Sequence, residues 1–168
     1  MQENNTTHKI IAINPGWRYL AIAVFDESEL REWRLKSIKG RGAKRKLERV
    51  KEILAGYIER YHPDILAIKK LHPSRSSANL DIMAAGIEAD CREKGMGVYS
   101  YSIQEMESIL SHSTRINKKE LTKLLTSEYP ELVHDLKREE RSRNQYFVRM
   151  FEAVALGHVC LREINNKH

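Results

Sequence analysis

The stretch Ile10-Ile11-Ala12-Ile13-Asn14-Pro15-Gly16 lies near the start of the chain and decides how the rest is interpreted. Its apolar residues show no helical period, and the Pro-Gly pair ends them abruptly, which indicates a buried strand followed by a tight turn. Ile65-Leu66-Ala67-Ile68-Lys69 repeats the pattern, and Phe151-Glu152-Ala153-Val154-Ala155-Leu156 is a third apolar run near the end. Each stretch carries one polar residue, and these are Asn14, Lys69 and Glu152.

Apolar periodicity predicts the other elements. Strands at His8–Asn14, Trp17–Phe25 and Glu29–Ile38 are separated by short turns, which favours an antiparallel meander. Over Lys44–Tyr61 the pattern becomes that of an amphipathic helix, which crosses over to a strand at Ile65–Ile68 in parallel pairing. The remaining expected elements are a helix striped by Leu80, Ala84, Ile87 and Cys91, a strand at Val98–Ser102, and helices at Gln104–Leu110, Asn117–Glu128 and Tyr146–Ile164.

Composition limits the class of protein. A chain of 168 residues with 41% hydrophobic content can bury one core, so we expect one α/β domain at 8–164 and flexible tails at 1–7 and 165–168. The net charge of +6 favours a polyanionic partner, DNA or RNA, although a merely soluble basic surface is the alternative. Cys91 and Cys160 fit free core thiols of a reduced protein. The sequence has no signal-peptide pattern and no apolar run of membrane-spanning length, which predicts a cytoplasmic location.

The predicted order β-β-β-α-β-α-β-α-α-α is that of the ribonuclease H-like fold. This fold has a central mixed five-stranded sheet, with three antiparallel strands and then parallel strands, flanked by helices. The Pro-Gly after Asn14, the Ala-Ile before Lys69 and the Ala-Val-Ala-Leu after Glu152 resemble motifs of RuvC-type Holliday-junction resolvases. The resemblance extends from residue 9 to residue 160. It implies a homodimer that binds four-way DNA junctions and cuts them with a metal-dependent endonuclease site.

The residues at the catalytic positions differ from those that the resemblance implies. The family has Asp, Glu and Asp where this chain has Asn14, Lys69 and Glu152, and many members have a further Asp at the position of Arg149. Two-metal hydrolysis needs several carboxylates around Mg2+ or Mn2+. Asn14 has no charge, Lys69 and Arg149 would repel a dication, and Glu152 is a weak metal ligand by itself. We expect no cofactor and a lost activity, with Mg2+ or Mn2+ as the metal if any activity remains.

An ion pair between Lys69 and Glu152 could replace the metal and hold the strand and the helix in register. Other acids could instead rebuild a carboxylate cluster, but each has an ordinary explanation in a turn, a strand entry or a solvated helix face. These acids are Asp26, Asp64, Asp81 and Glu88.

Basic residues are the candidates for contacts with nucleic acid. Two glycines in Lys39-Gly40-Arg41-Gly42-Ala43 let this loop follow a phosphate backbone, and the next helix begins with free amides. The predicted contacts, the last two by resemblance, are Lys39, Arg41, Lys44, Arg45, Lys46, Arg75, Lys118 and Lys119. A second basic cluster, predicted to be a mobile loop, comprises Lys137, Arg138, Arg141 and Arg143. A solvated, salt-bridged surface is the alternative for both clusters.

The sequence therefore favours a RuvC-like protein that binds branched or duplex nucleic acid without normal cleavage. One alternative is an active crossover-junction endonuclease with altered metal ligands. Another is a protein-interaction module whose old site is sealed by Lys69 and Glu152. Leu80, Met83 and Ile87 are expected either to face a dimer partner or to lie in the core.

Overall fold

A mixed five-stranded sheet forms the centre of the protein. The computed structural model describes residues 7–111, 118–135, 137 and 146–166. Over these residues the strand order is β3-β2-β1-β4-β5, with β1–β2 and β2–β3 antiparallel and β1–β4 and β4–β5 parallel. The strands are β1 Lys9–Pro15, β2 Tyr19–Asp26, β3 Glu29–Ser37, β4 Ile65–Lys69 and β5 Gly97–Tyr101. The predicted meander and the parallel crossover are both confirmed.

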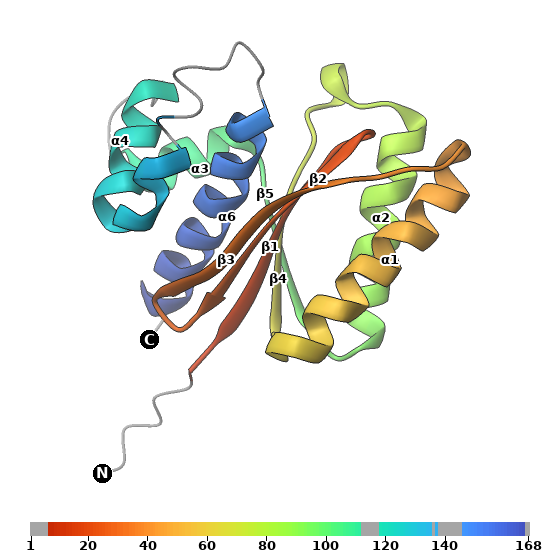
Figure 1. The fold of residues 1–168 in the computed structure, drawn as a ribbon, viewed down its shortest axis with the longest axis horizontal. Coiled ribbons are helices and arrows are strands. Elements are labelled where there is room, and N and C mark those ends of the chain that lie inside the picture. The colour runs from red at the N-terminus through yellow and green to blue at the C-terminus, as the bar shows by residue number, and fades with distance from the viewer. Residues whose placement is uncertain (1–6, 112–117, 136, 138–145, 167–168) are drawn as a thin grey trace.

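Helices cover both faces of this sheet (Figure 1). On one face lie α1 Gly42–Tyr61 and α2 Ala78–Glu93, and on the other lie α3 Ile103–Leu110, α4 Lys118–Glu128 and α6 Tyr146–Asn166. Two short 3-10 turns that the periodicity did not predict, η1 Pro73–Arg75 and η2 Pro130–Leu132, each begin at a proline. The predicted tails lie largely outside the described residues, and α6 continues through positions 165 and 166.

Each face of the sheet has its own hydrophobic core. Along β1, Ile10 and Ala12 pack on the α6 side, whereas Ile11 and Ile13 pack on the side of α1 and α2. This double burial explains why the strand is a continuous apolar run and not an alternating one. Cys91 and Cys160 are buried and are not joined in a disulfide, as predicted, and burial raises the pKa of Cys91 to about 11.

Met83 and Ile87 belong to the core and are fully buried, so neither faces a partner. Their neighbour Ile82 is 53% exposed on the outer side of α2. Helix α2 approaches α1 closely because Gly86 has no side chain, and a Cβ there would lie 2.4 Å from Leu47. Among the residues that the structure describes, no helix has the length and apolar character needed to cross a membrane.

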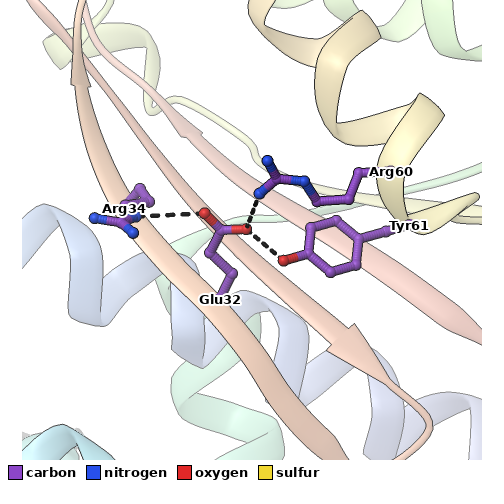
Figure 2. A network of polar contacts seen from close by, with 4 residues as sticks. All are labelled: Glu32, Arg34, Arg60 and Tyr61. Atoms are coloured by element: carbon purple, nitrogen blue, oxygen red, sulfur yellow. Dashed lines mark hydrogen bonds and ion pairs between the residues drawn. The ribbon is translucent and has the colours of Figure 1, made fainter.

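The edge strand β3 is fastened to the end of α1 by the carboxylate of Glu32 (Figure 2). Tyr61 Oη donates a hydrogen bond of 2.5 Å to this carboxylate, Arg34 Nε donates one of 3.3 Å, and Arg60 Nη1 lies 3.6 Å away. Burial alone would raise the pKa of Glu32, but these hydrogen bonds and charges together lower it. Arg34 and Arg60 are therefore partly neutralised by this contact and are weaker candidates for a phosphate.

His158 makes folding stability dependent on pH, because this α6 residue is buried against Tyr129 with their polar atoms 2.8 Å apart. Burial lowers the pKa of His158 below its ordinary 6.5. The unfolded chain therefore binds the proton more readily, and the stability contributed by the neutral imidazole is lost as pH falls below about 6.5. We expect urea-unfolding free energies to decline less between about pH 7 and pH 5 in His158→Phe than in the native chain. Identical pH slopes in the two proteins would contradict this assignment.

Candidate nucleic-acid interface

Asn14, Lys69 and Glu152 meet at one edge of the sheet, which we call the carboxyl edge because β1 and β4 both end there. Ile13 pairs with Ile68 in the parallel register, so the next residue on each strand, Asn14 and Lys69, is brought to the same level. Glu152 reaches them from the second turn of α6, which packs across both strands. Sites on open α/β sheets usually form at this end of the parallel strands.

The three side chains are joined by polar contacts that meet at the carboxylate of Glu152. Lys69 Nζ lies 2.6 Å from Glu152 Oε2, which confirms the predicted ion pair. Asn14 Nδ2 donates to the same oxygen over 2.9 Å and to the carbonyl oxygen of Arg149 over 3.2 Å. Asn14 is 3% exposed, and the side chains of Lys69 and Glu152 are 16% and 23% exposed. Direct side-chain contacts thus join the sheet to α6 at this point.

This arrangement does not fit a divalent metal ion. Both groups directed at the carboxylate are donors, an ammonium and an amide, and either would present hydrogens to a cation. An aspartate at position 14 would instead face the carbonyl of Arg149 and the carboxylate of Glu152 with acceptors alone. Within the described part of the chain, no three His, Cys, Asp or Glu side chains are grouped closely enough to hold a metal.

The four alternative acids are placed elsewhere, as their ordinary explanations suggested. Asp64 accepts hydrogen bonds from His8 and from the backbone nitrogen of Lys9. Asp81 is bonded by Ser76 Oγ at the start of α2, where Ser77 caps the helix. Asp26 and Glu88 lie near Arg31 and Arg92.

Arg149 lies directly over the turn that follows Asn14. Its Nη1 is only 2.0 Å from the point that a Cβ on Gly16 would occupy, so the guanidinium rests where other residues have a side chain. Arg149 is exposed, and no ion pair to it is found within the described residues. The backbone carbonyl of Arg149 accepts a hydrogen bond from Asn14, so the start of α6 lies against the end of β1.

The basic loop after β3 reaches the same edge, because β3 runs parallel to β1 (Figure 1). Gly40 and Gly42 have φ angles of 134° and 81°, which only glycine adopts without strain. Helix α1 begins directly afterwards with no side-chain cap and no acid in its first turn, so its amides can attract an anion. The exposed cations of this loop and first turn are Lys39, Arg41, Lys44 and Arg45.

Lys46 corrects the sequence prediction, because it is 6% exposed and cannot contact a phosphate. Its ammonium donates to the carbonyl oxygens of Trp17 and Ile38 over 2.5 and 3.3 Å, and it lies 4.5 Å from the centre of the Trp17 ring. Burial lowers the pKa of Lys46, and repulsion from Arg18 lowers it further. The residue fastens α1 to two turns at the carboxyl edge.

Arg18 is a basic residue at this edge that sequence reasoning missed. It is exposed in the turn between β1 and β2, and its carbonyl accepts a hydrogen bond of 2.8 Å from Ile38 N. This bond places Arg18 beside the start of the basic loop. A single arginine in a turn gave no signal, because only the pairing of β2 with β3 brings the two segments together.

The other predicted contacts are placed less fully. Arg75 lies in η1 and Lys118 begins α4, but their side chains are outside the described part of the structure. Lys119 is exposed on α4. Of the second basic cluster, Lys137 is exposed and helical, and the other three residues lie outside the described ranges.

Comparison with known proteins relates this geometry to a fold. No family model matches the sequence, and no curated protein matches it. Among solved structures, Thermus thermophilus RuvC in complex with a Holliday junction substrate is similar with a TM-score of 0.68 and 16% identity, covering 90% of this chain and 91% of that one. The yeast mitochondrial Holliday junction resolvase Ydc2 has a TM-score of 0.66 at 9% identity, covering 91% and 77%. This protein therefore has the RuvC-type ribonuclease H-like fold.

Proposed function

We propose that the protein binds branched or duplex DNA through the carboxyl edge of its sheet and does not cleave it. The observation that carries this proposal is that Asn14 and Lys69 both contact the carboxylate of Glu152. An ammonium lies at the carboxylate where two-metal chemistry would require a cation held by several acids. We place this function in the cytoplasm.

Charge at the carboxyl edge supports a nucleic-acid ligand. Five exposed cations lie on adjoining turns of this edge, and ion pairs to them are absent among the described residues. They are Arg18, Lys39, Arg41, Lys44 and Arg45. Several unpaired cations beside a helix N-terminus can neutralise several phosphates at once and release their counterions. The solved RuvC complex, which has the same fold, holds a Holliday junction.

The experiment that tests the proposal combines binding and cleavage. Four-way junction and duplex DNA of equal length are titrated with protein at two salt concentrations, in EDTA and in Mg2+ or Mn2+, and are analysed on native and denaturing gels. We expect salt-sensitive binding that favours the junction, with intact strands on the denaturing gel.

Two other outcomes would replace the proposal. Metal-dependent nicking that disappears in Glu152→Ala would identify an active endonuclease with altered ligands. Negligible affinity for DNA and for a matched RNA at low salt would instead favour a protein-interaction module, whose sealed site serves the fold. Tighter binding to the RNA than to the DNA would identify RNA as the ligand of the same binding surface.

A homodimer is part of the proposal, since two copies could engage two arms of a junction. Ile82, which is 53% exposed on α2, is an apolar residue available for such a contact. Light scattering coupled to gel filtration measures the mass directly. A monomer at micromolar concentration that stays monomeric on DNA would remove the dimer from the proposal.

A further inference from the structure

The charges at the old catalytic position are balanced without a metal ion. The carboxylate of Glu152 is paired with Lys69 and hydrogen bonded by Asn14, so the three side chains together carry no net charge. A scissile phosphate in a two-metal nuclease is held by cations that the protein's acids collect. In this protein Lys69 neutralises Glu152, so no metal ion is needed to balance the carboxylate.

Arg149 adds one positive charge above this neutral group. Its guanidinium occupies the space over Gly16, and a Cβ there would also lie 2.7 Å from the carbonyl oxygen of Tyr19. Glycine at position 16 therefore lets the guanidinium of Arg149 lie against the end of β1. Because Arg149 is exposed and no acid pairs with it in the described ranges, its N–H donors are available to a ligand.

We propose that Arg149, seated on Gly16, binds a phosphodiester directly, so that DNA binding at the old catalytic position is independent of divalent metal. The inference rests on the proposed function and deepens it. Guanidinium donors form a planar fork that matches two phosphate oxygens, which a hydrated metal ion would otherwise contact. Arg18 follows Gly16 by two residues, so the phosphate seat continues into the basic surface.

The first test compares Arg149→Gln with Arg92→Gln. Arg92 is exposed at the far end of α2, so its change removes the same charge at the opposite edge. Affinity for the four-way junction is measured by fluorescence anisotropy over a series of salt concentrations, in EDTA and in Mg2+ at equal ionic strength. We expect Arg149→Gln to weaken binding about fivefold to tenfold and to reduce the salt slope by about one, while Arg92→Gln changes affinity by less than about twofold.

Gly16→Ala provides the second test, because it keeps every charge and removes the seat of the guanidinium. We expect this variant, once circular dichroism shows it folded, to lose affinity as Arg149→Gln does. If it does not fold, the comparison of Arg149→Gln with Arg92→Gln decides by itself. Native binding in EDTA should equal binding in Mg2+ within about twofold.

The outcomes separate this inference from the proposed function. Tight binding by the native chain with equal affinities of Arg149→Gln and Arg92→Gln overturns only the proposed contact between Arg149 and a phosphate. Binding that appears only when Mg2+ is added also overturns it. No binding by the native chain, even at low salt, overturns the proposed function and the inference together.

Discussion

Replacing Lys39, Arg41, Lys44 and Arg45 together with glutamine is expected to lower affinity for DNA about a thousandfold near 0.1 M salt. Each exposed cation that neutralises one phosphate contributes about 0.9 to the slope of log affinity against log salt, so four contacts account for such a loss. The salt slope itself should fall by about one per residue. Anisotropy titrations at several salt concentrations measure both quantities.

A control variant with four other cations replaced by glutamine separates local contacts from net charge. Arg31, Arg60, Arg92 and Lys94 are exposed toward the opposite edge of the sheet, and their loss changes the total charge by the same amount. We expect this control to reduce affinity only slightly, through the long-range field. Equal losses in the two variants would mean that the basic loop is not the binding surface.

Lys69→Met is expected to destabilise the fold by about 1–3 kcal/mol, because Glu152 then keeps its charge with only Asn14 as a partner. The pair is partly exposed, so the cost lies below that of breaking a fully buried one. Lys69→Met combined with Glu152→Gln removes both charges and leaves an amide oxygen that Asn14 can bond. This double variant should recover to within about 1 kcal/mol of the native chain.

Urea unfolding of the native chain, Lys69→Met, Glu152→Gln and the double variant measures the coupling between the two side chains. Additive losses, with the double variant worse than either single one, would show that the two groups act independently. Adding Mg2+ to Lys69→Met provides a further control. Stabilisation by the metal would mean that the released carboxylate can collect a cation after all.

Most of the fold could be predicted from the sequence, because the spacing of apolar residues distinguishes its helices from its strands. The run from Ile10 to Ile13 is apolar on both faces and became a central strand, as a sheet covered on both sides requires. The Lys69–Glu152 pair was also predictable, since two opposite charges at the positions of metal ligands have few other ways to be buried. The turns η1 and η2 were not predicted because one turn has no period.

Basic contacts were harder to predict, because a run of cations does not reveal which one points inward. Lys46 lies four residues before Val50, and Val50, Leu54 and Tyr57 continue the buried stripe of α1. Helical spacing therefore contained the signal that Lys46 is buried, but its charge suggested the surface. Arg18 had no such signal, because its neighbourhood is set by hydrogen bonding between distant segments.

The buried ammonium of Lys46 makes this lysine an internal reference for chemical footprinting. An amine-directed reagent needs solvent access, which Lys39 and Lys44 have and Lys46 lacks. Bound DNA should slow the labelling of the two exposed lysines and leave the already slow labelling of Lys46 unchanged. A rise in its labelling would report that the turns at Trp17 and Ile38 have separated from α1, so one reagent can distinguish occupancy of the surface from opening of the fold.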